Sequence, residues 1–226
     1  MTDRYARNKE LISAAEQALL QSKTAAIIGL GGLGGHIAEQ LARLGLGRLI
    51  LIDGDKLEQS NLNRQLFATE NLLGLPKTEA ALLRLKEVNS AVAYTSHQLR
   101  LTADNGPELL QGADIVLDAT DNIATRLVLE AVCEQLGLPL IHGAIGGWWG
   151  QVSVVFPGDG TLSRLYPDSE AIGIEAKYGN PAFTPALVAS IQAAEALKLC
   201  LGRPESLRGK LLSIDLLTHE YFTIDV

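Results

Sequence analysis

The sequence predicts an α/β fold with a mostly parallel sheet, an N-terminal helix and antiparallel strands near the C-terminal end. Three observations predict it. Short apolar runs, too continuous for half-exposed strands, alternate with stretches of helical spacing. A glycine-rich turn joins the first apolar run to the next helical stretch. Beyond residue 150 polar and apolar residues alternate singly, which is typical of antiparallel strands.

The first half of the predicted core begins with a helix and two strands. Apolar residues recur at helical spacing within residues 1–23, at Leu11, Ile12, Ala15, Ala18 and Leu19. We expect one amphipathic N-terminal helix there. The runs Ala25 to Gly29 and Arg48 to Asp53 are predicted parallel strands covered on both faces. Leu33 to Leu44 has the length and spacing of the crossover helix between them.

The alternation of helix and strand continues to about residue 143. In chain order we predict a helix from Pro76 to Asn89, strands from Ala91 to His97 and Asp114 to Ala119, a helix from Asn122 to Gly137 and a strand from Pro139 to Gly143. Pro76 suits a first helical turn, where no backbone donor is needed.

The remaining segment changes character. Gln151 to Phe156 is predicted to be an antiparallel strand, followed by weakly patterned, Pro- and Gly-containing sequence. A helix from Ala186 to Leu201 and strands from Lys210 to Leu216 and Glu220 to Ile224 end the chain. We therefore expect a single domain: a nucleotide-binding core over residues 24–156, a mobile crossover loop over 157–185, and a C-terminal helix and strands over 186–226.

Composition narrows the function classes. The chain has 226 residues, 47% of them hydrophobic, and a net charge of −7, which gives no basic footprint for nucleic acid. Apolar runs fall short of the roughly 20 residues that span a bilayer, and the N-terminus lacks a signal-peptide pattern, so we expect a cytoplasmic protein. The two cysteines form no Cys-x-x-Cys pair, so neither a disulfide framework nor a zinc site is indicated.

The glycine turn indicates a nucleotide site of the Rossmann type. Gly29-x-Gly31-x-x-Gly34 supplies a tight turn and lets phosphates approach the backbone at a helix N-terminus. Asp53 ends the next predicted strand, where such folds place the acid that binds ribose hydroxyls. A dehydrogenase would look the same up to this residue.

Polar residues after Asp53 favour ATP over NAD. Asp55, Ser60 and Asn61 are followed by two cations, Arg64 and Lys77. A planar guanidinium fork and an ammonium point charge suit the β and γ phosphates of ATP better than the two bridging phosphates of NAD. Taken singly, each cation is more simply a solvated surface charge, and their joint occurrence argues against that interpretation.

Another polar cluster follows the predicted strand that ends near Ala119. Open α/β sheets collect ligands at the carboxyl ends of their strands. We expect Asp121 to hold Mg²⁺ against the phosphates, because magnesium takes carboxylate and phosphate oxygens. We expect Asn122 mainly to cap the following helix.

These motifs together resemble the ThiF/MoeB/HesA family, bacterial relatives of the ubiquitin-activating enzymes. The resemblance rests on Gly29-Leu30-Gly31-Gly32-Leu33-Gly34, Asp53-x-Asp55, Ser60-Asn61-Leu62-x-Arg64-Gln65, Pro76-Lys77 and Thr120-Asp121-Asn122. It implies ATP-dependent adenylation of a carboxylate, commonly the C-terminal Gly-Gly of a small ubiquitin-like sulfur carrier of thiamine or molybdopterin biosynthesis.

The resemblance also implies roles for individual residues. The nucleotide would be bound by Gly29, Gly31, Gly32, Gly34, Asp53, Asp55, Ser60, Asn61, Arg64, Lys77, Asp121 and Asn122. Asp53 would bind ribose, Asn61, Arg64 and Lys77 the phosphates, and Asp121 the Mg²⁺. Arg4-Tyr5-Ala6-Arg7-Asn8 resembles a segment whose second arginine enters the neighbouring subunit's site, so Arg7 would act in trans in a homodimer.

The chain departs from the family pattern in its cysteines. Many relatives carry two zinc-binding Cys-x-x-Cys pairs, and some a crossover-loop cysteine that takes the acyl group; this sequence has none of these. Cys133 and Cys200 are expected to be buried small hydrophobes.

Three function classes stay open. They are a zinc-free adenylyltransferase of a ThiS- or MoaD-like carrier, an adenylyltransferase of a small-molecule or peptide carboxylate, and a non-catalytic partner or NAD-binding protein. Trp148 and Trp149 could line a pocket for a flat substrate or pack within the sheet.

Overall fold

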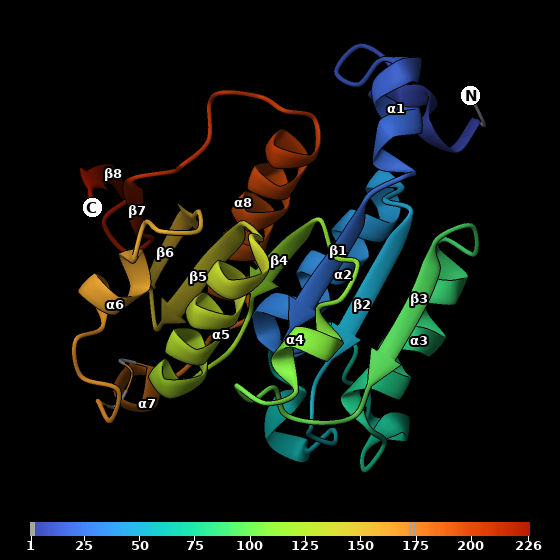
Figure 1. The fold of residues 1–226 in the computed structure, drawn as a ribbon. Helices are drawn as coiled ribbons and strands as arrows, with labels where there is room; N and C mark the ends of the chain where they lie inside the picture. The colour runs from blue at the N-terminus through green and yellow to red at the C-terminus, as the bar shows by residue number, and fades with distance from the viewer. Residues whose placement is uncertain (1–2, 172, 174) are drawn as a thin grey trace.

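An eight-stranded sheet forms the centre of the computed structural model, which describes residues 3–171, 173 and 175–226. Its strands are β1 Thr24–Ile28, β2 Arg48–Ile52, β3 Ala93–His97, β4 Ile115–Asp118, β5 Leu140–Gly146, β6 Trp149–Val155, β7 Lys210–Asp215 and β8 Glu220–Asp225. They lie in the order β3-β2-β1-β4-β5-β6-β7-β8 (Figure 1). Strands β1 to β5 pair in parallel, and β6 to β8 add antiparallel pairs. The predicted fold class is confirmed.

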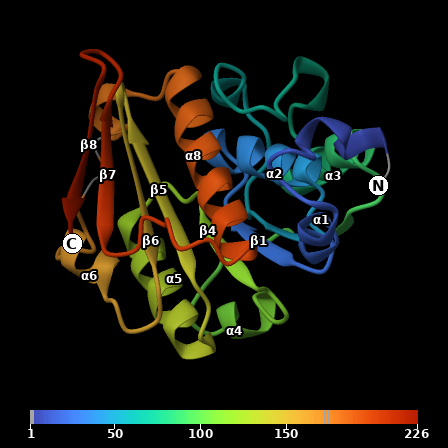
Figure 2. The same ribbon diagram turned by 90° about the horizontal axis from the view of Figure 1, so that it is seen from above.

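Helices cover both faces of the sheet. Figure 2 shows α2 (Gly32–Leu44), α3 (Lys77–Val88) and α8 (Phe183–Cys200) on one face, and α4 (Gly106–Leu109) and α5 (Ile123–Leu136) on the other. Two hydrophobic clusters fill the spaces between sheet and helices. Successive residues of β1 enter opposite clusters, because side chains alternate along a strand. This explains why the sequence of β1 is apolar throughout.

The N-terminal segment differs from the single helix that the spacing predicts. A 3-10 helix, η1 (Asp3–Asn8), precedes α1 (Ala14–Leu20). The break has a local cause: Ser13 and Glu16 form a capping box, which starts a new helix at that point. The predicted apolar stripe was wrong at all of its residues except Ile12, which is buried. Leu11 is 69% exposed, Leu19 is 41% exposed, and Ala15 and Ala18 are also exposed, whereas Leu20 is buried.

The crossover segment contains regular structure that the sequence pattern did not reveal. Two short helices, α6 (Thr161–Leu165) and α7 (Glu175–Tyr178), lie within residues 157–185. The Glu130 carboxylate on α5 accepts hydrogen bonds from the backbone N–H groups of Leu162 and Ser163, which holds the start of α6. Helix α8 begins before Ala186. Mobility of this segment stays a prediction.

Two expectations about buried residues are confirmed. Cys133 and Cys200 are free and buried, and burial raises the pKa of each thiol to about 12.

Short 3-10 turns, η2 (Gln59–Asn61) and η3 (Glu70–Leu72), lie between β2 and α3. Within the described residues, the helices all lack the length and apolar character needed to cross a membrane.

Candidate nucleotide-binding site

A cavity of about 230 Å³ opens at the carboxyl ends of the parallel strands. The arrowheads of β1, β2 and β3 point to this end in Figure 1. The cavity is lined by the glycine turn, by residues that follow β2, β3 and β4, by a residue of β5 and by a residue of the crossover segment. The lining includes Gly29, Gly31, Gly32, Asp53, Asp55, Arg64, Gln65, Lys77, Leu99, Arg100, Leu101, Thr120, Asp121, Asn122, Arg126, Ile145 and Asn180. Open α/β sheets bind ligands at this edge.

Glycine is required at two positions of the turn. Gly29 has φ +90°, and a Cβ there would lie 2.6 Å from the Ala119 carbonyl oxygen. A Cβ on Gly34 would lie 1.8 Å from the Gly29 carbonyl oxygen. The turn is therefore closed against the chain after β4, and Gly31 and Gly32 at the start of α2 face the cavity. This helix N-terminus, which borders the cavity, suits a phosphate.

Asp53 supports the glycine turn and also faces the cavity. Its Oδ2 accepts the Leu30 N–H at 2.7 Å, and its Oδ1 accepts the Asp55 N–H at 2.7 Å. Burial raises the pKa of Asp53, and the Lys77 ammonium and these N–H donors oppose the rise. Each carboxylate oxygen retains a lone pair, so ribose hydroxyls could still donate to Asp53.

Lys77 is held by carboxylates from the chain after β2. Its Nζ lies 3.1 Å from Asp55 Oδ2 and 3.9 Å from Asp53 Oδ2. Arg100 also pairs with Asp55, at 2.9 Å. Burial acts to raise the pKa of Asp55, but the two cations outweigh it and leave that pKa below its usual value. Lys77 would have to share its charge between these acids and a phosphate.

Arg64 has no carboxylate partner among the residues that the structure describes. Its Nη1 donates to the Ser60 carbonyl at 2.7 Å and to Asn63 Oδ1 at 2.9 Å. A Cβ on Gly32 would lie 3.7 Å from Arg64 Cγ, so the guanidinium stem stands beside the glycine turn. An anion in the cavity would meet this cation without competition from an acid.

Asn122 caps α5 as expected, whereas the Mg²⁺ role of Asp121 stays a prediction. Asn122 Oδ1 accepts the Thr125 N–H at 2.8 Å and caps α5, which confirms its predicted capping. Asp121 is exposed and lines the cavity. No cluster of three His, Cys, Asp or Glu side chains suited to a metal occurs across residues 3–171, 173 and 175–226. The single carboxylate of Asp121 is compatible with Mg²⁺, because this ion often binds one or two carboxylates and completes its shell with phosphates and water.

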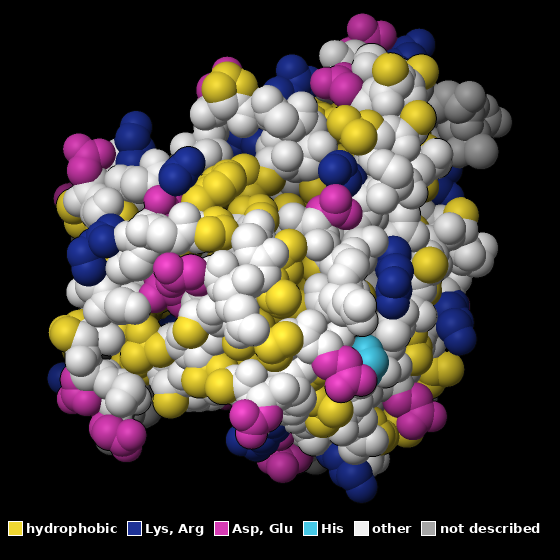
Figure 3. Space-filling model, viewed as in Figure 1, with side chains coloured by type: hydrophobic (Ala, Val, Ile, Leu, Met, Phe, Trp, Pro, Cys, Tyr) yellow, Lys and Arg dark blue, Asp and Glu magenta, His cyan; other side chains and the backbone are white. Residues whose placement is uncertain are grey.

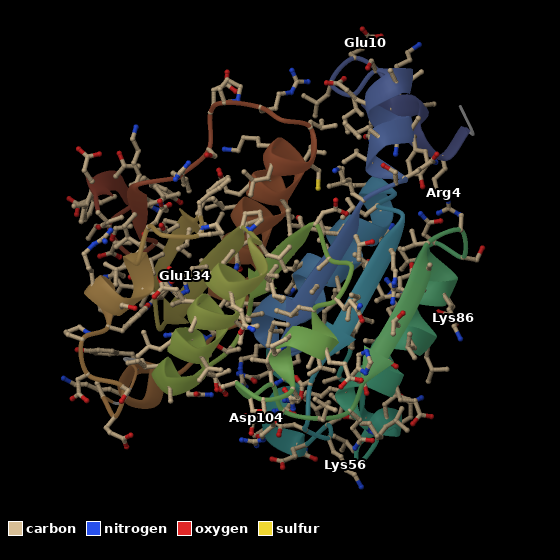
Figure 4. The ribbon with its side chains drawn as sticks, viewed as in Figure 1. Arg4, Glu10, Lys56, Lys86, Asp104 and Glu134 are labelled. Carbon is tan, nitrogen blue, oxygen red and sulfur yellow. The ribbon has the colours of Figure 1, made fainter. Side chains whose placement is uncertain are left out.

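Some predicted site residues lie outside the cavity lining. Gly34 packs against Gly29, and Asn61 uses its Oδ1 to accept the Glu58 N–H. Ser60 meets Arg64 through its carbonyl. Arg7 is exposed on η1, the element that carries Arg4, and Figure 4 places Arg4 at the opposite end of the molecule from Lys56 and Asp104.

Sequence reasoning missed several cavity residues. Leu99, Arg100 and Leu101 follow β3, whose carboxyl end lies beside that of β2. The predicted parallel sheet carried this signal, since the predicted strand from Ala91 to His97 would end at the same edge as the others. Arg126 is only 4% exposed and lies one turn into α5, and Asn180 comes from the crossover segment. A local pattern does not reveal either of these.

The family assignment agrees with this geometry. The ThiF family matches residues 5–226, nearly the whole chain. This chain belongs to the ThiF family.

Curated relatives of this ThiF-family chain cover it almost completely. The SAMP-activating enzyme E1 of Haloferax volcanii is 36% identical over 228 residues, which covers 98% of this chain and 84% of that protein. The sulfur carrier protein adenylyltransferase of Thermus thermophilus is 35% identical over 235 residues, covering 99% and 87%. Other relatives are longer, and the chain spans 51% and 50% of two of them.

A solved structure shares the fold. E. coli MccB with MccA-N7isoASN superposes with a TM-score of 0.84 at 24% identity, covering 100% of this chain and 72% of that one. At this identity the likeness shows the architecture alone.

Proposed function

We propose that this ThiF-family protein is an adenylyltransferase that uses ATP to activate the C-terminal Gly-Gly carboxylate of a ThiS- or MoaD-like sulfur carrier. One observation carries the proposal: the glycine turn, Arg64, Lys77 and Asp121 surround a single cavity. The relative named sulfur carrier protein adenylyltransferase supports this choice of substrate. Thiamine and molybdopterin biosynthesis are both compatible with it.

The proposed reaction needs alignment and charge neutralisation. A carboxylate oxygen attacks the α-phosphorus, the bond from that phosphorus to the bridging oxygen breaks, and pyrophosphate leaves with the electron pair. Arg64, which pairs with no acid in the described part of the chain, would bind the phosphates, and Lys77 would turn toward them. Asp121 would hold Mg²⁺, which neutralises phosphate charge when bound. Asp53 would orient the ribose.

A dehydrogenase is the weaker alternative. NAD would use the glycine turn and Asp53, but its two phosphates give no reason for Arg64, Lys77 and Asp121 to face one cavity. On the face drawn in Figure 3, basic and acidic side chains are mixed, and this does not support a nucleic-acid partner.

An exposed apolar surface supports a protein substrate over a metabolite. Large apolar side chains are about half exposed on both faces of β8 and on the turn before it: Leu217, Tyr221, Phe222 and Ile224. The Leu216 N–H donates to the Trp148 carbonyl at 3.0 Å, so the turn before β8 lies beside the β5–β6 turn, where Trp148 packs against Phe183. Patches of this kind mark interaction sites.

The paired tryptophans give little support to a small flat substrate. Neither Trp148 nor Trp149 is among the cavity-lining residues. Trp149 Nε1 donates to Asp215 Oδ2 at 3.1 Å, and its ring meets Tyr178 edge-on. Packing between β6, β7 and the crossover segment explains Trp149.

We also propose a homodimer in which Arg7 completes the partner's site. In its own chain η1 lies far from the cavity, at the end marked by Arg4 in Figure 4. Arg7 could therefore meet nucleotide only in another subunit. A cytoplasmic location remains our prediction.

Pyrophosphate exchange tests the function directly. The protein is incubated with ATP, Mg²⁺, labelled pyrophosphate and either a Gly-Gly carrier, the same carrier without its last glycine, or small carboxylates. We expect label in ATP with the intact carrier alone. Exchange with a small carboxylate would favour the metabolite alternative. Tight NAD binding with no ATP binding would refute adenylation.

A further inference from the structure

A buried polar chain joins β4, β5 and the end of α6, outside the residues assigned to catalysis. His142 on β5 is fully buried, and its Nδ1 lies 2.7 Å from Asp118 Oδ2 at the end of β4. Its Nε2 lies 2.9 Å from the hydroxyl of Tyr166, directly after α6. Gln151 on β6 also donates to that hydroxyl.

The direction of these hydrogen bonds follows from charge. Burial lowers the pKa of His142 and so favours the neutral ring, while the hydrogen bond to Asp118 opposes this shift. Burial acts to raise the pKa of Asp118, but its hydrogen bonds and the charge of Arg126 leave that pKa below its usual value. An ionised carboxylate only accepts, so His142 Nδ1–H donates to Asp118 and Nε2 accepts the Tyr166 O–H.

Asp118 also forms hydrogen bonds with the loop that carries Asp121. Its Oδ1 accepts both the N–H of Thr120 at 2.9 Å and the Thr120 hydroxyl at 2.7 Å. Arg126 Nη2 donates to the Thr120 carbonyl at 2.9 Å, and Arg126 Nε lies 3.8 Å from Asp118 Oδ2. Hydrogen bonds therefore hold the backbone N–H, the carbonyl and the side-chain hydroxyl of Thr120. The next residue is Asp121.

Tyr166 brings the crossover segment into the same network. Its ring lies under the Arg126 guanidinium, 5.4 Å from centroid to Cζ. Figure 1 shows α6 beside α5, and Glu130 on α5 binds the start of α6. The crossover segment and the Asp121 loop thus share one set of buried hydrogen bonds.

We propose that Asp118, His142 and Tyr166 are positioning residues, through which the docked crossover segment sets the position of Asp121 for adenylation. The catalytic part of this inference rests on the proposed function. The structural part, coupling between Tyr166 and residues 118–126, does not. Removing the hydroxyl takes the 2.9 Å partner away from the buried His142 Nε2 and leaves it the longer contact with Gln151 Nε2, at 3.4 Å, so the network would loosen.

Tyr166→Phe tests the proposal with little change in shape. The ring and its contact with Arg126 remain, and only the hydroxyl is lost. Tyr94→Phe is the matched control, because it removes a tyrosine hydroxyl on β3 that donates to the Leu85 and Asn89 carbonyls, at 3.1 and 2.8 Å, outside this network. Hydrogen–deuterium exchange without substrate should rise in residues 118–126 for Tyr166→Phe and stay unchanged there for Tyr94→Phe. Equal behaviour of the two variants in residues 118–126 would overturn the coupling.

Kinetics then test positioning in the full-length protein. We expect Tyr166→Phe to lower kcat of pyrophosphate exchange by about tenfold with KM for ATP nearly unchanged, because the ribose and glycine-turn contacts are untouched. Tyr94→Phe should retain both constants. A change in KM alone, or an unchanged kcat, would refute a positioning role.

A second variant and the wild type keep the outcomes separate. If Tyr166→Phe does not fold, Gln151→Leu removes another hydrogen-bond partner of the hydroxyl and should give the same two signatures. If the wild type itself shows no exchange with any carboxylate, the proposed function fails. The hydrogen–deuterium result still decides the coupling.

Discussion

Replacing Lys77 by methionine should lower both activity and stability, and the structure allows each loss to be sized. The Lys77 side chain is 10% exposed and balances Asp53, which is 8% exposed, and Asp55, which is 47% exposed. Breaking a buried ion pair costs about 3–5 kcal/mol when the remaining charge is left uncompensated. Asp53 keeps two backbone donors and Asp55 keeps Arg100 and solvent, so we expect about 1–2 kcal/mol of unfolding free energy to be lost.

The activity loss should be larger. An aligned cation beside phosphates contributes about 3–4 kcal/mol to the transition state, so exchange in Lys77→Met should fall by about 10²–10³. Urea unfolding and pyrophosphate exchange on the same preparations measure both losses.

Arg64→Ala is the control that separates the two effects. Arg64 bonds only to a backbone carbonyl and an exposed amide among the described residues, so its removal should change stability by less than about 0.5 kcal/mol. Exchange should fall as it does for Lys77→Met. Near-normal exchange in Lys77→Met would remove Lys77 from the mechanism, and wild-type stability would show that its ion pairs are worth little.

The pH dependence provides an internal check. Burial raises the pKa of Asp53 and Lys77 opposes the rise, so that pKa should be higher still in Lys77→Met. When a carboxyl pKa is higher in the folded state than in the unfolded state, the folded state is destabilised at pH values above the folded-state pKa. At pH values below the unfolded-state pKa this effect is absent. The stability deficit of Lys77→Met should therefore shrink as the pH falls through the raised Asp53 pKa. A deficit independent of pH would contradict this account.

Three other predictions concern separate parts of the molecule. Mixing inactive Arg7→Ala and Asp121→Ala proteins should restore partial exchange through hybrid sites, and no recovery despite proven subunit exchange would refute the in-trans role. Cys133 and Cys200, whose thiols have a pKa of about 12, should resist iodoacetamide at pH 8 until the protein is unfolded, and fast native labelling would refute their burial. The pKa of Asp118 is lower in the folded state than in the unfolded state, where it is about 3.9. The stability that Asp118 contributes should therefore be lost as the pH falls from the unfolded-state pKa through the folded-state pKa. In urea unfolding from pH 5 to pH 2, the stability of Asp118→Asn should fall less steeply than that of the wild type.

Local sequence signals predicted most elements because each element has its own physical cause. The continuous apolar runs that became β1 and β2 need cover on both faces, and Asn122 caps α5 in the structure as its residue type suggests. The prediction failed where two causes competed. The N-terminal apolar spacing continues through Ser13, but the capping box there restarts the helix. Helices α6 and α7 are too short to show a period.

The sequence by itself identified the cavity residues of the glycine turn, Asp53, Arg64, Lys77 and Asp121, since each belongs to a short motif at or after a strand end. Only the tertiary structure decided how they are partnered. It set Lys77 between two acids, placed no acid beside Arg64 among the residues described, and joined Asp118 to Tyr166 through His142. These partners come from separate strands and a distant crossover segment. Strand pairing and burial bring these partners together, and a local sequence pattern does not predict contacts between distant segments.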